Sequence, residues 1–129
     1  MNEAFETAAR ALRDAYRGVP IAPLRDVLAP TDVAGAYAVQ TINTHHWVEE
    51  GRRIVGRKVG LTAKAVQVQL GVDQPDFGVL FADMEVANGG HLDPATMLQP
   101  KAEGEVAMIL GRDLPGPDIS RADVEAAVA

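Results

Sequence analysis

The sequence contains no cysteine among its 129 residues. A disulfide framework, a thiolate ligand for structural zinc and a thiol nucleophile are therefore all excluded. Any metal site would have to use oxygen or imidazole ligands, and such ligands favour hard cations.

Basic residues and long apolar runs are also scarce. The chain has 12 Lys and Arg against 18 Asp and Glu, with a formal net charge of −6. Because nucleic-acid binding depends on a basic surface, we expect a small-molecule or protein partner instead. No apolar run approaches the roughly 20 residues that a membrane span needs. The N-terminus, MNEAFETAAR, has acidic residues where a signal peptide would begin with basic ones, so the expected compartment is the cytoplasm.

The first third of the chain, residues 1–51, has the pattern of two helices. Asn2 can cap a helix that runs to about Arg17, and Thr31 or Asp32 can cap a second helix that stops at a glycine. Aromatic residues at helical spacings are assigned to the core of this region; they are Tyr16, Tyr37 and Trp47.

From Arg53 onward, the pattern favours β-structure. RIVGRKVG is typical of a strand that ends at Gly60, and Thr62 can cap a short helix, AKAVQVQL. A strand-like run, FGVLFADMEVA, and the hairpin signal NGG follow. The pattern predicts one domain over residues 1–129, in which residues 52–129 begin a β-rich catalytic region.

The last predicted helix opens at Ser120, with Asp123 in capping-box position. The chain reaches Ala129 one or two turns later, without a C-cap signal and with the apolar residues AAVA at its end. We therefore expect the sequence to be a truncated part of a longer domain.

The segment KAEGEVAMIL contains two neighbouring acids, Glu103 and Glu105. Read as a strand, it places both on one face with Cα atoms about 6.6 Å apart. Their carboxylates can converge on one Mg²⁺ ion, because neighbouring ligand oxygens around this ion are only about 3 Å apart. A Glu-x-Glu pair alone is more often the solvated face of a strand.

Lys58 shares its predicted strand face with Gly56 and Gly60. The glycines leave room for a carboxylate or an enolate to approach the ammonium group, and a partly buried lysine can move its proton. The alternative is an edge-strand lysine whose charge reaches solvent. Asp76, which precedes FG, is either the acidic partner of Lys58 or the start of a turn.

Two segments together, GRKVGLTAKAVQVQLGVDQPDFGVLFADM and QPKAEGEVAMILGRDL, resemble the 2-keto-4-pentenoate hydratase family. That family includes 2-oxohept-3-ene-1,7-dioate hydratase and 4-oxalocrotonate decarboxylase, and it belongs to the fumarylacetoacetate hydrolase superfamily. The resemblance covers nearly the whole chain but only the front portion of the family's length. It implies an α+β fold, in which an N-terminal helical region precedes a mixed, mostly antiparallel β-roll, and assembly into homo-oligomers.

The resemblance also implies roles for individual residues. Glu103 and Glu105 correspond to ligands of Mg²⁺ or Mn²⁺, and a third acidic ligand is expected beyond Ala129. Lys58 matches a lysine that binds substrate and relays protons, and Asp76 matches an acid that orients the substrate or takes part in the transfer.

The activity implied is that of a metal-dependent hydratase in the catabolism of aromatic compounds, acting on a 2-hydroxy-2,4-dienoate or its 2-oxo-enoate form. A 4-oxalocrotonate-type decarboxylase would use the same residues to release CO₂ from a 2-oxo acid. A third alternative is an inactive, truncated relative that serves as a binding or assembly subunit.

Overall fold

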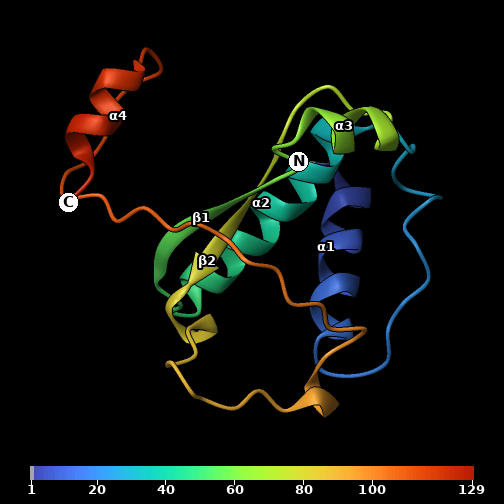
Figure 1. Ribbon diagram of the computed structural model, residues 1–129. Helices are drawn as coiled ribbons and strands as arrows, with labels where there is room; N and C mark the ends of the chain where they lie inside the picture. The colour runs from blue at the N-terminus through green and yellow to red at the C-terminus, as the bar shows by residue number, and fades with distance from the viewer. Residues whose placement is uncertain (1) are drawn as a thin grey trace. The chain divides into compact units, whose positions relative to one another are not determined.

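The computed structural model describes residues 2–129 and divides into two compact units, Met1–Gly90 and His91–Ala129. Each unit is described by itself. The elements of the first unit, in chain order, are the helices and strands α1 (Glu3–Ala15), α2 (Val33–Glu49), β1 (Ile54–Gly60), α3 (Lys64–Leu70) and β2 (Asp76–Phe81), followed by the 3₁₀ turn η1 (Ala82–Met84) (Figure 1). The second unit contains the 3₁₀ turn η2 (Pro94–Thr96) and α4 (Arg121–Ala127). Helices and an antiparallel strand pair make this an α+β protein, as predicted.

Helices α1 and α2 begin at the caps that the sequence predicts. The Asn2 side chain accepts a hydrogen bond from the Ala4 N–H, and the Asp32 side chain accepts one from the Gly35 N–H. The two helices pack on each other around buried residues, with partly buried hydrophobic side chains at the margin. The buried residues are Ala8, Ala9 and Val39, and the marginal ones are Phe5, Leu12, Leu24, Val27, Leu28 and Ile42. Small alanine side chains on α1 let the helices approach closely.

Strands β1 and β2 form an antiparallel pair in which Lys58 lies opposite Gly78, and Gly60 lies opposite Asp76. Burial alternates along β1, with Lys58 and Gly60 on its half-buried face, so the predicted strand and its end at Gly60 are confirmed. Helix α3 also forms where predicted, but its N-cap is Ala63, without a side-chain hydrogen bond, and not Thr62.

Helix α2 covers the backbone of β2 at Phe77. The Phe77 N–H donates to Oη of Tyr37 at 3.0 Å, and Nε2 of Gln40 donates to the Phe77 carbonyl oxygen at 3.1 Å. Side chains of the helix thus satisfy backbone groups that a strand at a sheet edge would otherwise expose.

An aromatic cluster joins α2 to the far end of β2. The Phe81 side chain is almost completely buried, and its ring meets that of Trp47 edge-on, with 5.8 Å between centroids. The Arg52 guanidinium lies 4.2 Å from the centroid of the Phe81 ring. Tyr16 also meets the Trp47 ring edge-on but is 80% exposed, so its assignment to the core was wrong. It follows the last residue of α1, and its ring therefore lies at the rim of the cluster.

The strand predicted over KAEGEVAMIL is absent from the second unit, so that prediction was wrong for the described residues. Residues 101–109 form no strand, and within residues 2–129 the only pairing near this segment is an isolated bridge between Leu110 and Val128. All side chains of residues 101–110 are exposed. Alternation is a local property of the sequence, whereas a strand also needs a neighbouring strand, which the described residues do not supply here. By contrast, α4 has the predicted capping box of Ser120 and Asp123.

The strand-like run FGVLFADMEVA is also shorter than expected. It ends as a strand at Phe81 and continues into η1. The NGG signal forms a turn, in which the Gly90 N–H donates to the Ala87 carbonyl oxygen at 2.7 Å, but no paired strands flank it in the described part of the chain. Among residues 2–129, no helix is both long and apolar enough to cross a bilayer.

We expect Phe81→Ala to lower the free energy of unfolding by about 3–5 kcal/mol, because it would leave a cavity under Trp47 and Arg52. Urea unfolding followed by the fluorescence of Trp47, the only tryptophan, measures this loss. Phe77→Ala is the matched control, because it removes the same side chain from the same strand at a position that is 52% exposed. Equal losses in the two variants would contradict the role of Phe81 as an anchor of the first unit.

Candidate active site

The pairing of β1 with β2 places Lys58 and Asp76 on one face of the sheet. Asp76 lies directly opposite Gly60, and residues two apart on a strand project to the same side, so Lys58 and Asp76 are diagonal neighbours. Diagonal neighbours are about 7–8 Å apart, which a lysine side chain can span. Lys58 is half-buried and Asp76 is exposed. The structure therefore brings together the cation and the acid that the sequence singled out within one unit.

Gly60 gives the Asp76 carboxylate the space it occupies. A methyl group built on Gly60 would overlap Oδ1 of Asp76 and lie 3.1 Å from its Cγ. The same methyl group on Gly56 would meet only the Leu80 side chain, at an ordinary contact distance of 3.7 Å. The room beside Lys58 that the sequence suggested for a ligand is thus used, at Gly60, by the protein's own carboxylate.

A cavity of about 780 Å³ lies beside Asp76. Its walls come from the start of α2 and the loop before it, from Leu61, and from residues 70–77. The wall is largely apolar, with Asp76 and Gln40 among its polar groups, and its volume is in the range of small-molecule sites. The sequence did not predict that Tyr37 and Gln40 line this cavity. Their spacing is that of any helix face packed on a sheet, and it does not distinguish cavity-lining residues from other packed residues.

A buried amide holds the turn that follows β1. Leu61 has a positive φ of 54°, which is uncommon for a residue with a side chain. Gln67, only 2% exposed, donates to the Leu61 carbonyl oxygen at 2.6 Å and accepts from Nζ of Lys64 at 3.0 Å. These bonds stabilise an unfavourable backbone conformation in the cavity wall directly after Gly60.

Glu103 and Glu105 lie in the second unit, in the extended segment of exposed side chains. Two carboxylates have the chemistry of hard-cation ligands. Within residues 2–129, however, no group of three or more His, Cys, Asp or Glu side chains could hold a metal ion. Glu103 and Glu105 could therefore supply two ligands to a divalent cation, and no third acidic, His or Cys side chain among residues 2–129 completes the site.

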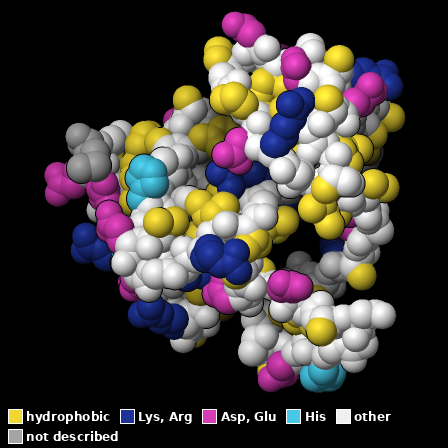
Figure 2. All heavy atoms as spheres, turned by 90° about the vertical axis from the view of Figure 1, so that its left-hand side faces the viewer, with side chains coloured by type: hydrophobic (Ala, Val, Ile, Leu, Met, Phe, Trp, Pro, Cys, Tyr) yellow, Lys and Arg dark blue, Asp and Glu magenta, His cyan; other side chains and the backbone are white. Residues whose placement is uncertain are grey.

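Acidic and basic side chains alternate over the face shown in Figure 2, with apolar side chains between them. On this face, basic groups are not gathered into a stripe of the kind that binds a phosphate backbone.

Comparison with known proteins adds to this geometry. No family model matches the chain. The chain is 63% identical to 2-keto-4-pentenoate hydratase 2 of Dechloromonas aromatica over 110 residues, which cover 84% of this chain and 42% of that protein. It is 49% identical to the TodF product hydratase of Pseudomonas putida F1 over 126 residues, covering 97% of this chain and 47% of that protein.

The fold is similar to a solved 4-oxalocrotonate decarboxylase from Pseudomonas putida G7, complexed with magnesium and adipate. The TM-score is 0.89 at 31% sequence identity, and the match covers 99% of this chain and 49% of that one. The chain thus spans about half the length of the curated relatives it matches. The resemblance drawn from the sequence, and its restriction to a front portion, are confirmed.

We expect Gly60→Ala to destabilise the first unit by about 1 kcal/mol, because the added methyl group overlaps Oδ1 of Asp76 and the exposed carboxylate must rotate away. In an Asp76→Ala background, the same substitution should cost much less, so the two changes should be non-additive. Urea unfolding of the wild type, the single variants and the double variant measures the coupling. Gly56→Ala is the control, and additivity of Gly60→Ala with Asp76→Ala would show that the carboxylate does not occupy this space.

Proposed function

We propose that this chain, the front portion of a member of the 2-keto-4-pentenoate hydratase family, supplies part of the active site of a 2-oxo-enoate hydratase that acts in the catabolism of aromatic compounds. The observation that carries the proposal is the 63% identity to a 2-keto-4-pentenoate hydratase. Asp76 lines a cavity of small-molecule size and is a diagonal neighbour of Lys58, which supports the proposal.

The reaction would proceed in two stages. A 2-hydroxy-2,4-dienoate would first become a 2-oxo-enoate, as the proton of its 2-hydroxyl group is lost and a proton is added at a remote carbon. Water would then add across the remaining carbon–carbon double bond, with its oxygen bonding to the carbon remote from the 2-oxo group. No group leaves, and no oxidant or reductant is required.

The chain's own residues would bind the substrate and move protons. The Lys58 ammonium group would attract the substrate carboxylate or the developing enolate oxygen and relay a proton. Asp76, which lines the cavity and lies over Gly60, would orient the substrate or accept a proton. The apolar wall of the cavity would receive the hydrocarbon end of the substrate.

Glu103 and Glu105 would hold a divalent cation, Mg²⁺ or Mn²⁺, together with further ligands outside residues 2–129. Such an ion, when bound, acts as a Lewis acid that stabilises an enolate. The presence of magnesium in the similar decarboxylase structure supports this assignment.

Two other functions stay open. The structural similarity to a 4-oxalocrotonate decarboxylase favours release of CO₂ from a 2-oxo acid, although the identity to it, 31%, is lower than to the hydratases. A binding or assembly subunit is the alternative of another class.

The finer architecture is also a proposal. We infer that residues 1–129 belong to one domain, in which residues 101–110 become a strand of a mixed, mostly antiparallel β-roll within a cytoplasmic homo-oligomer. The exposure of Val106, Met108 and Ile109 supports this, because a strand with such apolar side chains gains stability when a neighbouring element covers them.

Incubation of the purified full-length protein with 2-hydroxypenta-2,4-dienoate and, separately, with 2-oxohex-3-enedioate tests the function. We expect hydration of the first compound, followed by loss of the dienoate absorbance and identification of the hydroxylated product by mass. Release of CO₂ from the second compound without hydration of the first would establish the decarboxylase instead. Absence of both reactions would favour a binding or assembly subunit.

Glu103→Gln and Glu105→Gln should each weaken the binding of Mg²⁺ or Mn²⁺ by about tenfold or more, because each removes a charged oxygen ligand. Titration calorimetry with the metal alone measures this, independently of activity. Asp113→Asn is the control, since it removes another exposed acid of the same unit. Unchanged affinity in either glutamine variant would refute the ligand assignment.

Lys58→Ala should reduce turnover about 10²- to 10⁴-fold, the usual contribution of a positioned proton relay. Thermal unfolding should change little, because the strand face around Lys58 consists mainly of glycines. Arg57→Ala, on the exposed face of the same strand, is the matched control. Full activity with an unchanged pH profile, or failure of the variant to fold, would show that Lys58 is structural.

A further inference from the structure

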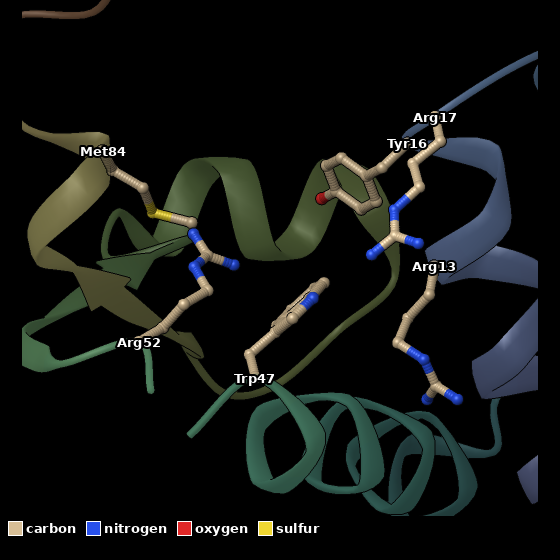
Figure 3. Close-up of a pocket in the computed structure, with 6 residues that line it drawn as sticks. All are labelled: Arg13, Tyr16, Arg17, Trp47, Arg52 and Met84. Carbon is tan, nitrogen blue, oxygen red and sulfur yellow. The ribbon is translucent and has the colours of Figure 1, made fainter. Parts of the chain in front are cut away.

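The first unit contains a second, smaller cavity of about 160 Å³. It lies between the C-terminal end of α1, the last turn of α2, and the residues on either side of the strand pair. Its lining residues are Arg13, Tyr16, Arg17, Trp47, Arg52 and Met84 (Figure 3). None of them lines the larger cavity beside Asp76.

Three arginine side chains line this cavity, and among residues 2–129 only that of Arg52 has a carboxylate partner. Arg52 donates to both oxygens of Asp83, at 2.8 and 2.9 Å, and these hydrogen bonds hold the pKa of Asp83 below its usual value. Arg13 donates to the amide oxygen of Asn43 at 2.6 Å. The Arg17 guanidinium makes no hydrogen bond or ion pair within residues 2–129, and only its backbone N–H is bonded, to the Asp14 carbonyl oxygen. In a chain with a net charge of −6, this is a local excess of positive charge.

Aromatic rings form the rest of the cavity wall. Tyr16 and Trp47 meet edge-on, with centroids 5.8 Å apart and an interplanar angle of 88°. Figure 3 shows Arg17 and Arg52 reaching toward the space beside Trp47 from opposite sides, whereas Arg13 points away toward α2. A ligand in this space would therefore meet a flat apolar surface and guanidinium groups together.

We propose that this cavity binds a small, flat carboxylate, of the size and shape of benzoate. A guanidinium group matches a carboxylate with two parallel hydrogen bonds, which its fixed fork geometry favours. A planar conjugated or aromatic body packs against Trp47 and Tyr16 better than a puckered one. The volume is too small for a nucleotide or a peptide helix. Inorganic phosphate would satisfy the cations but leave the aromatic wall without a contact.

The proposal is independent of the proposed hydratase activity, because it concerns other residues and another cavity. Trp47 is the only tryptophan of the chain and lines the site, so its fluorescence reports on occupancy directly. Titration of the protein with benzoate at constant ionic strength should give a saturable change. Benzamide, a neutral molecule of the same shape, should bind at least about tenfold more weakly, since it lacks the charge that strengthens the hydrogen bonds. Inorganic phosphate should give no saturable change.

Arg17→Gln should weaken benzoate binding about tenfold or more. The variant should keep its fold, because Arg17 is exposed and follows the end of α1. Arg10→Gln is the matched control, an exposed arginine of α1 that does not line the cavity, and its affinity should equal that of the wild type.

Several outcomes would overturn the proposal. They are a fluorescence change that never saturates, equal binding of benzamide and benzoate, wild-type affinity in Arg17→Gln, and displacement of benzoate by equimolar phosphate. A saturable response to a glutamate-rich peptide, without any response to benzoate, would also overturn it by indicating a protein partner.

Discussion

The antiparallel register between β1 and β2 is the constraint on which the rest of the first unit depends. A slip of one residue would move every side chain of a strand to the opposite face. In the observed register, Asp76 lies over Gly60 on the face of Lys58, and the buried Phe81 lies opposite Ile54 at the other end of the strand pair. The same pairing therefore places the candidate site residues at one end of the strand pair and the buried anchor at the other.

Local signals predicted the helices well. Asn2, Asp32 and Ser120 each satisfy backbone N–H groups at the start of a helix, and this interaction involves only residues within a few positions. The strand predicted over residues 101–110 has an equally clear alternation, but it forms no ladder within the described residues. The alternation of apolar and polar residues indicates which face of a strand would be buried. The strand itself forms only when another segment, elsewhere in the chain or in the assembly, provides backbone hydrogen bonds.

The candidate site was predictable in part. Glycines around Lys58 and an acid before FG are visible in the sequence, and the resemblance to a family gave them proposed roles. That the Asp76 carboxylate fills the space over Gly60 could not be predicted, because it depends on which residue of β2 lies opposite Gly60. The positive φ of Leu61 and its hydrogen bond from the buried Gln67 could not be predicted either. The sequence around them is that of an ordinary helix start.

Helix α2 positions strand β2, so Lys58 and Asp76 do not have to stabilise the fold themselves. Tyr37 bonds the backbone of Phe77 at one end of β2, and Trp47 meets Phe81 at the other. Ten residues of helix rise about 15 Å, and four residues of strand span about 13 Å, so both contacts can form at once. Because the helix fixes both ends of β2, the position of Asp76 and the strand face of Lys58 depend on contacts made by other side chains.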